Sequence, residues 1–237
     1  MNAQTERIQL VMLPGLVNDE RLWERQASDL SDIVNTQIAD ISTRDSIGDL
    51  AEEVLAHAPT RFALVGLSMG GYVAMEIMRR APERVIGLAL CDTNARADTP
   101  EATARRRHQM ALAQADFAQV IDTLAPGMFA PTHVGDTRLV MLFADMAANQ
   151  GPDAFIRQQN AIIGRPDSLP GLANISCPTM ILCGADDQLS SIELHREMAD
   201  AIPDSELVVI RNAGHLSPIE QPKDVSAALR RWLERLH

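Results

Sequence analysis

Ser68 lies in a glycine-rich turn between two apolar segments. Residues 62–65 form a short apolar run that predicts a buried strand, and residues 72–80 carry apolar side chains at helical spacing. Between them, residues 66–70 read Gly-Leu-Ser-Met-Gly, a G-x-S-x-G pattern. In a tight strand-to-helix turn the central serine adopts a strained backbone conformation, so its neighbours must be small and its hydroxyl projects above the sheet. The pattern therefore predicts a nucleophilic serine.

The G-x-S-x-G pattern has a second interpretation. The string also occurs by chance, and two glycines after a strand can serve only to let a helix pack closely. A serine hydroxyl is a weak nucleophile at neutral pH, so a catalytic role requires a base and an acid that orients the base. Catalytic groups of parallel sheets gather beyond the carboxyl ends of the strands. The residues that follow the other predicted strands therefore decide between the two interpretations.

Two later segments supply an acid and a base. Residues 184–187, Gly-Ala-Asp-Asp, follow a strand predicted from Pro178 to Cys183. His215 lies in a glycine-flanked loop after a strand predicted at 206–210. The order is serine, acid, histidine, and each member follows a strand, which predicts a proton relay. The residues alone do not choose between the two aspartates at 186 and 187.

The other histidines fit different roles. His57, His108 and His195 fall within predicted helices with polar neighbours, which indicates solvated or structurally hydrogen-bonded side chains. His133 lies in a helical region and is a candidate for contact with a substrate, and His237 is the terminal residue. Only His215 combines a glycine-flanked loop with the end of a strand.

The segments around these residues alternate between strands and helices. Short apolar runs predict strands at 8–13, 33–39, 62–65, 85–91, 178–183 and 206–210, and helical spacing predicts helices at 19–30, 46–58, 72–80, 192–201 and 222–236. Strands that are apolar throughout are typical of a parallel sheet covered by helices on both faces. We therefore expect an α/β fold with a mostly parallel, doubly wound sheet of about six to seven strands.

Residues 98–164 interrupt this alternation. Helices are predicted at 102–115, 117–124, 136–149 and 153–163 with no convincing strand between them, and the second is expected to end at Pro126 and Gly127. Such an insertion after the fourth predicted strand is typical of a cap over the sheet edge, although the helices could also continue the outer layer. We expect a core of residues 1–97 and 165–237 and a helical cap of residues 98–164.

With these segments in order, the chain resembles the α/β-hydrolase fold family over nearly its whole length. The matching segments are residues 13–16 (Leu-Pro-Gly-Leu), 66–71 (Gly-Leu-Ser-Met-Gly-Gly), 184–187 and 214–222 (Gly-His-Leu-Ser-Pro-Ile-Glu-Gln-Pro). The resemblance implies that Ser68 is the nucleophile, His215 the general base and acid, and Asp187 the orienting carboxylate. The family pattern Gly-x-x-Asp selects Asp187 over Asp186. Asp92 is the second candidate, because some members place their acid after the preceding strand.

The same resemblance implies an oxyanion hole formed by the backbone N–H groups of Leu16 and Met69. The N–H of Met69 comes at a helix N-terminus, where it can face a developing negative charge. The family usually has His-Gly where this chain has Pro14 and Gly15, so the usual bracing of that loop is in question. A serine rather than an aspartate in the turn argues against haloalkane dehalogenase chemistry.

A narrower resemblance lies at the start of the expected cap. Residues 90–101, Leu-Cys-Asp-Thr-Asn-Ala-Arg-Ala-Asp-Thr-Pro-Glu, are similar to the matching segment of 3-oxoadipate enol-lactonases, which belong to the α/β-hydrolases. Arg105, Arg106 and Arg107 follow this segment. They are candidates to meet an anionic acyl group, but three arginines on a helix more often form a solvated face.

These observations lead to one expected function and its alternatives. We expect a serine hydrolase of the carboxylesterase or lactonase type that cleaves a small carboxylic ester, thioester or lactone through an acyl-enzyme on Ser68. Acyl transfer or carbon–carbon bond hydrolysis on the same scaffold is the alternative. A second alternative is a non-catalytic protein that traps a ligand under its cap. No metal site is apparent, and the expected mechanism requires no cofactor.

Composition and charge limit the partners of this 237-residue chain. It has 21 Lys and Arg residues against 32 Asp and Glu residues, a net charge of −11, which argues against nucleic acid or an anionic membrane as a partner. No window approaches about 18 consecutive apolar residues, and no secretory signal is evident, so we expect a cytoplasmic location. Three cysteines imply no disulfide framework. The expected partner is a small-molecule ester or lactone, and both a monomer and a homodimer fit the sequence.

Overall fold

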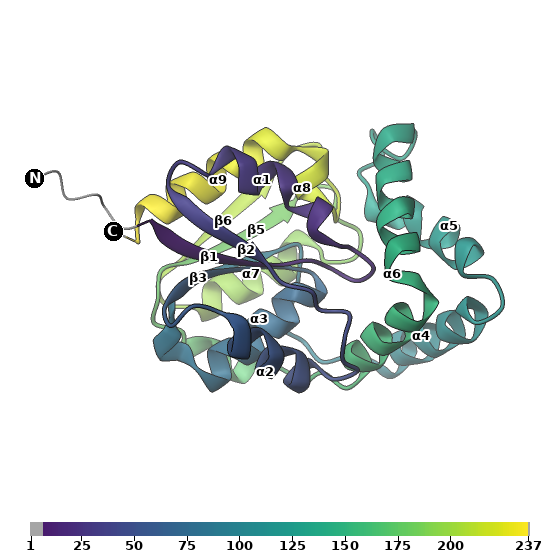
Figure 1. Cartoon of the computed structure of the whole chain (residues 1–237), viewed down its shortest axis with the longest axis horizontal. Helices are drawn as coiled ribbons and strands as arrows, with labels where there is room; N and C mark the ends of the chain where they lie inside the picture. The colour runs from purple at the N-terminus through teal and green to yellow at the C-terminus, as the bar shows by residue number, and fades with distance from the viewer. Residues whose placement is uncertain (1–6, 237) are drawn as a thin grey trace, which may run out of the picture.

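The strands of the computed structural model, which describes residues 7–236, form one sheet of six parallel strands (Figure 1). They are β1 (Ile8–Leu13), β2 (Val34–Ile38), β3 (Phe62–Leu67), β4 (Val85–Cys91), β5 (Thr179–Gly184) and β6 (Ser205–Ile210). Their order across the sheet is β2-β1-β3-β4-β5-β6. Strands β3 and β5, inside the sheet, are buried along their whole length, as their unbroken apolar sequences predicted. The expected parallel α/β sheet is therefore confirmed.

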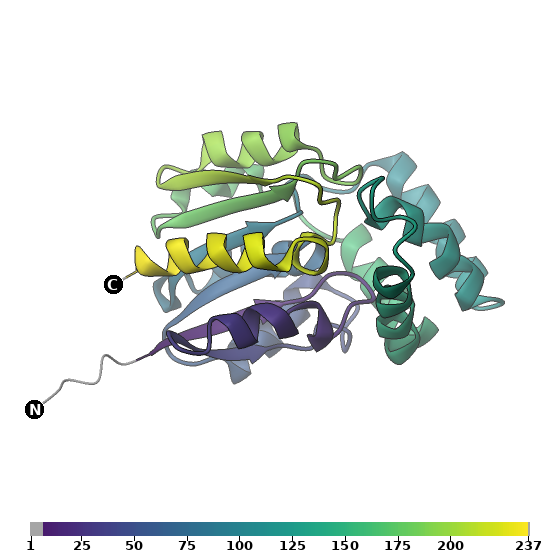
Figure 2. The same ribbon diagram turned by 90° about the horizontal axis from the view of Figure 1, so that it is seen from above.

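Helices cover both faces of the sheet (Figures 1 and 2). One face carries α1 (Glu24–Asp29) and α9 (Pro222–Glu234), and the other carries α2 (Ile47–His57), α3 (Met69–Arg80) and α7 (Ile192–Ala201). Each face has its own apolar core, because the strand side chains alternate between the two layers. The doubly wound arrangement brings the carboxyl ends of all six described strands to one edge.

Three further helices lie together beyond that edge, away from both layers (Figures 1 and 2). They are α4 (Pro100–Ala113), α5 (Phe117–Met128) and α6 (Thr137–Ile163). Gly151 interrupts α6 with a φ of 78°, and Pro152 follows it, so this element consists of two helical halves. The sequence predicted two helices there. Because neither half continues through the glycine, the second half turns back towards the sheet (Figure 1).

The expected end of α5 is wrong. The helix continues through Pro126 and Gly127 to Met128, although proline removes one helical hydrogen bond. Tertiary contacts hold this last turn, since the carbonyl of Met128 accepts hydrogen bonds from the N–H groups of His215 and Leu216 at 3.0 and 3.2 Å. The local signal for a helix end is therefore overridden by an anchor on a distant loop.

Short elements complete the described chain. They are η1 (Glu20–Leu22), η2 (Pro82–Arg84), η3 (Leu169–Asn174) and α8 (Ser217–Glu220). The three cysteines are free thiols, of which Cys91 and Cys183 are buried and Cys177 is half-buried. Over residues 7–236, the helices are all too short or too polar to cross a membrane.

Candidate active site

The turn between β3 and α3 holds Ser68 in a strained backbone conformation. Ser68 has a φ of 53° and a ψ of −113°, in the region of φ that side chains other than glycine rarely adopt. A Cβ atom at Gly66 would collide with the carbonyl of Gly70, and one at Gly70 would collide with the carbonyls of Leu13 and Pro14. Only glycine therefore fits on either side of the serine. This is the structural reason for the G-x-S-x-G pattern.

Hydrogen bonds from β4 and the residues after it hold the strained serine in place. The N–H of Ser68 donates to the carbonyl of Cys91 at 3.0 Å, and the hydroxyl of Thr93 donates to the carbonyl of Ser68 at 2.8 Å. Thr93 also packs against Gly71, where a Cβ atom would lie 2.6 Å from the threonine side chain. The neighbouring strand therefore fixes the direction in which the serine hydroxyl points.

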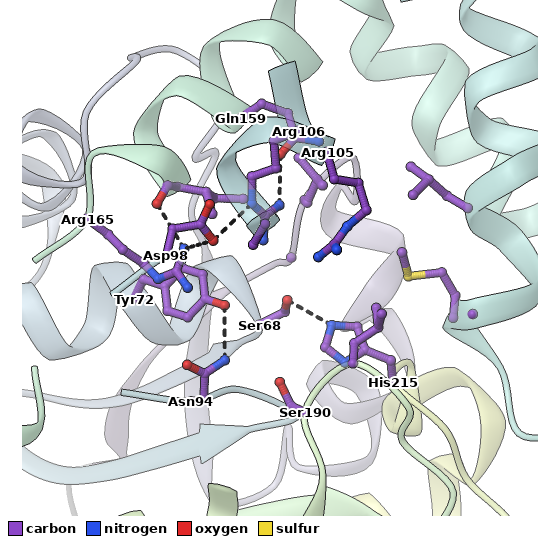
Figure 3. Close-up of a pocket in the computed structure, with 18 of the residues that line it drawn as sticks. Ser68, Tyr72, Asn94, Asp98, Arg105, Arg106, Gln159, Arg165, Ser190 and His215 are labelled. Carbon is purple, nitrogen blue, oxygen red and sulfur yellow. Dashed lines mark hydrogen bonds and ion pairs between the residues drawn. The ribbon is translucent and has the colours of Figure 1, made fainter. Parts of the chain in front are cut away.

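Ser68, His215 and Asp187 form a continuous hydrogen-bonded series. The Oγ of Ser68 lies 2.8 Å from Nε2 of His215, and Nδ1 of His215 lies 2.8 Å from Oδ2 of Asp187. Figure 3 shows the first of these bonds at the floor of a cavity. The second carboxylate oxygen of Asp187 accepts from the N–H groups of Leu189 and Ser190 at 2.8 and 3.0 Å. The structure thus brings together three side chains from three different strand ends.

The two aspartates of the Gly-Ala-Asp-Asp segment have different surroundings. Asp187 is buried and directed at His215, whereas Asp186 is exposed. Burial disfavours the charged carboxylate of Asp187, but His215 and the two N–H donors outweigh burial and lower its pKa. Burial also disfavours the charged form of His215, which lowers the pKa of the imidazole. The charge and the hydrogen bond of Asp187 outweigh this effect and raise the pKa of His215 above its usual value. Asp187 is therefore ionised and suited to orient a neutral imidazole.

Asp92, the second candidate for the acid, has both carboxylate oxygens engaged elsewhere. Oδ1 accepts from the N–H of Gly184 at 2.8 Å, and Oδ2 accepts from the hydroxyl of Ser217. The side chain is completely buried, and burial, with the charge of Asp187, raises its pKa well above the usual value. Asp92 thus joins β4 to β5 and to the start of α8.

The two predicted oxyanion donors lie beside the serine. Met69 is the first residue of α3, where a backbone N–H has no partner within the helix, and Leu16 follows β1 and lines the cavity. Within residues 7–236, neither N–H donates a backbone hydrogen bond. Both groups are therefore available to a ligand.

The loop after β1 has a brace that the sequence did not reveal. Val17 adopts a φ of 55°, and its N–H donates to the side-chain oxygen of Gln158 at 2.9 Å. Gln158 comes from α6, is fully buried, and its amide nitrogen donates to the carbonyl of Ile41 at 3.4 Å. The indole of Trp23 donates to the carbonyl of Leu13 at 3.1 Å on the other side. These contacts hold the loop in place, although it begins with Pro14 and Gly15 instead of the usual His-Gly.

The remaining histidines lie away from the serine. His195 is buried and bonded at both ring nitrogens, Nδ1 to the carbonyl of Ser191 and Nε2 to the N–H of Thr93, as expected for a structural residue. Burial lowers its pKa. His57 and His108 are exposed, also as expected. His237 lies outside the described residues.

His133, a candidate for substrate contact, has a different partner. Its Nδ1–H donates to Oε2 of Glu220 at 3.0 Å, and the ring is not part of the cavity wall. Glu220 was not predicted as a site residue, yet its buried carboxylate also accepts from Gly214 at 2.8 Å and from Ala130 at 2.8 Å. It therefore ties the loop of His215 to the α5–α6 connection. The only signal in the sequence was a glutamate inside the family motif at 214–222.

The serine and the imidazole open into a cavity of about 670 Å³ between the sheet edge and α4–α6 (Figure 3). Its wall includes Leu16, Tyr72, Asn94, Arg105, Leu124 and Gln159. The volume suits a small organic molecule. Across the described residues, the side chains of His, Cys, Asp and Glu make no group suited to a metal ion.

Comparison with known proteins identifies the family of the chain. A family model described as the alpha/beta hydrolase family matches residues 11–228. A curated relative, the candidate non-heme bromoperoxidase BpoC of Mycobacterium tuberculosis, is 30% identical over 206 residues, which cover 79% of this chain and 74% of the relative.

Two solved structures have the same overall fold. A thermophilic esterase from Thermogutta terrifontis, solved with malate bound, superposes with a TM-score of 0.88 at 29% identity, covering 97% of this chain and 90% of the other. The enol-lactonase from Burkholderia xenovorans LB400 superposes with a TM-score of 0.87 at 23% identity, covering 96% of this chain and 92% of the other. At that identity the enol-lactonase supports the fold alone. Sequence match, fold and the arrangement around Ser68 lead to one conclusion: the chain belongs to the alpha/beta hydrolase family.

Proposed function

We propose that this protein is a serine hydrolase that cleaves a small carboxylic ester, thioester or lactone through an acyl-enzyme on Ser68. The observation that carries the proposal is the unbroken series of 2.8 Å contacts from Asp187 through His215 to Ser68. The series ends in the cavity, where a substrate carbonyl would have access to the serine. The esterase at 29% identity supports the same class of reaction.

Each group has a defined part in the proposed reaction. Ser68 Oγ attacks the carbonyl carbon while Nε2 of His215 takes the hydroxyl proton, and ionised Asp187 stabilises the imidazolium that forms. The N–H groups of Leu16 and Met69 hold the oxyanion of the tetrahedral intermediate. His215 then protonates the leaving oxygen or sulfur. In the second half, His215 removes a proton from water, the hydroxide attacks the acyl-enzyme, and Ser68 regains its proton.

We also propose that residues 98–164 serve as a cap. The support is the position of α4, α5 and α6 over the strand ends and their share of the cavity wall, which includes Arg105, Leu124 and Gln159. The cap contacts the loop of the base directly, because the N–H of His215 donates to the carbonyl of Met128 at 3.0 Å. A cap of this kind excludes bulk water and selects substrates by shape.

Replacement of the nucleophile tests the proposal. We expect Ser68→Ala to lower kcat for a panel of esters and lactones by about 10⁴-fold or more, with an unchanged melting temperature. A fluorophosphonate should label the wild-type protein at Ser68 and leave the variant unlabelled. Ser31→Ala, which removes an exposed serine outside the cavity, is the control and should behave as wild type.

Four outcomes would count against the proposal. A Ser68→Ala variant that keeps more than about a tenth of the activity would exclude the acyl-enzyme on this residue. Absence of label on the wild-type protein would favour a non-catalytic binding protein. Products found only when an acceptor alcohol or amine is present would favour acyl transfer, and carbon–carbon cleavage products would favour the other reaction of this scaffold.

A further inference from the structure

The described lining of the cavity carries more positive than negative charge. Among the described residues, four arginines line the cavity, namely Arg96, Arg105, Arg106 and Arg165, and Asp98 is the one carboxylate in the lining. This excess contrasts with the net charge of −11 for the whole chain. A positive cluster inside an acidic protein is a local feature that composition does not explain.

Two of these arginines share the single carboxylate. Oδ1 of Asp98 lies 2.9 Å from Nη1 of Arg165 and 3.2 Å from Nε of Arg106. The Asp98 side chain is only 2% exposed, and the guanidinium of Arg165 lies 4.4 Å from the centre of the Tyr72 ring. One negative charge therefore serves two guanidinium groups. Arg96 pairs separately with Glu197 at 2.8 Å.

Arg105 differs from the other three arginines of the cavity lining because it has no partner among the described residues. Over residues 7–236 it takes part in no ion pair or side-chain hydrogen bond, and Figure 3 shows its side chain extending into the cavity above Ser68 and His215. Arg107, two positions later on the same helix, is also exposed but does not line the cavity. The three arginines of this segment therefore split into one paired, one free in the cavity and one outside it.

We propose that Arg105 binds a carboxylate of the substrate. The substrate is then an ester or lactone that carries a free carboxylate, such as a monoester of a small dicarboxylic acid. A guanidinium donates two parallel N–H groups to a carboxylate, and the unbalanced charge of the Arg106–Asp98–Arg165 group adds further attraction. This inference rests on the proposed hydrolysis at Ser68, because it identifies which ester reaches that residue.

Matched pairs of esters test the inference. The monomethyl and dimethyl esters of succinate, glutarate and adipate differ in one negative charge at each chain length. We expect the wild-type protein to prefer a monomethyl ester, and Arg105→Gln to lower its kcat/KM about tenfold, mainly through KM. Hydrolysis of the dimethyl esters should change less than about twofold. Arg105→Lys should restore part of the preference, and high salt should weaken it.

The control variant is Arg107→Gln, which removes the same charge from the same helix outside the cavity. It should leave kcat/KM for both ester types as in the wild-type protein. The inference is overturned if the wild-type protein shows no preference for the charged esters, or if Arg105→Gln and Arg107→Gln have equal effects. An uncharged fluorophosphonate separates this from failure of the proposed function: it should label Ser68 equally fast in wild type and Arg105→Gln, whereas no labelling in either would refute the hydrolase itself.

Discussion

The imidazole of His215 is held from both sides in a buried position. Asp187 accepts its Nδ1–H at 2.8 Å, and Nε2 faces the hydroxyl of Ser68 at the same distance. The carboxylate cannot turn away, because two backbone N–H groups hold its second oxygen. At the scale of single residues, the proposed reaction depends on the protonation state and orientation of this one ring.

The pH dependence of hydrolysis follows from the raised pKa of His215. A general base must be neutral, so kcat/KM for an uncharged ester should rise with pH and be lost as pH falls through a pKa above 6.5. In Asp187→Asn the stabilising charge is gone while burial remains, so the pKa of His215 should fall. The acidic limb of the pH–rate profile, where kcat/KM is lost, should therefore move to lower pH. The same change should lower kcat by about 10⁴-fold, since the imidazole loses its orienting acceptor. A pH–rate profile measures both effects.

Asp92→Asn is the comparison for that profile. Its carboxyl group accepts hydrogen bonds from other partners, Gly184 and Ser217. Asparagine tolerates the positive φ of 46° at this position. We expect the limb to shift much less in Asp92→Asn than in Asp187→Asn. The opposite ranking would make Asp92 the orienting acid.

The site residues were predictable to different degrees. Ser68 and His215 stand out in the sequence because a strained turn and a loop at a strand end need glycine neighbours, which leave a local pattern. Asp187 could be chosen over Asp186 only by family resemblance, since burial is not visible in two adjacent aspartates. Glu220 and Gln158 were not foreseeable as site supports, because Gln158 reaches Val17 across 141 positions of the chain.

At the scale of elements, α6 supports the loop that carries a proposed oxyanion donor. Gln158 in its second half accepts from Val17, the residue after Leu16, and donates to Ile41. The loop itself has a residue in the left-handed region, which local sequence does not favour. The position of the Leu16 N–H therefore depends on a side chain from α6 rather than on the loop alone.

Gln158→Leu should impair the chemical step more than substrate binding. The change keeps a similar volume but leaves the buried N–H of Val17 without an acceptor, so the loop should relax. The N–H of Leu16 should then no longer point at the oxyanion. We expect kcat to fall about tenfold or more while KM changes little. Steady-state kinetics with an uncharged ester, together with a melting curve, measure the effect.

Gln158→Glu supplies the matching rescue. A buried glutamate has a raised pKa, and in its protonated form it accepts from Val17 and donates to Ile41 as glutamine does. Activity, measured as a fraction of the wild-type value at the same pH, should therefore be recovered at pH values where that carboxyl is protonated. Equal kcat in Gln158→Leu and wild type would show that the loop needs no support from α6.

The strands were easier to predict than the helices near the site. Unbroken apolar runs such as residues 62–65 have few alternatives in a parallel sheet, and all six described strands lie where they were expected. The predicted end of α5 was wrong because the last turn of this helix is held by the loop of His215, a tertiary contact with no local signal. Helix α8, at Ser217–Glu220, was missed because four residues are too short to show a helical period.

At the scale of the whole molecule, the two ends of the inserted helical segment are joined by charge. Asp98 precedes α4, and Arg165 follows α6. Their 2.9 Å ion pair, with the 3.0 Å bond from Arg165 Nε to the carbonyl of Arg96, closes residues 98–164 into a loop on the sheet edge. Both side chains are buried, so either one left alone would be a buried charge without a partner.

Asp98→Asn should therefore destabilise the whole fold. Asparagine keeps an acceptor oxygen but leaves the charge of Arg165 uncompensated, and the loss should be about 3 kcal/mol in the free energy of unfolding at neutral pH. Burial disfavours the ionised carboxylate of Asp98, but the two arginines outweigh it and lower its pKa. A lowered pKa gives stability that is complete above 3.8 and is lost as pH falls through the folded value. The difference between wild type and Asp98→Asn should shrink over that range.

Urea unfolding at several pH values from 7 down to about 3 measures this difference. Asp204→Asn is the control, because Asp204 pairs with Arg235 at 2.6 Å between side chains that are 52% and 36% exposed. Water screens such a pair, so its removal should leave the free energy of unfolding nearly unchanged. Equal losses in the two variants, or a loss in Asp98→Asn that stays constant below pH 3.8, would mean that the buried pair does not hold the inserted helices to the sheet. A loss confined to Asp98→Asn that fades with acid would mean that this one carboxylate closes the inserted helical segment onto the sheet edge.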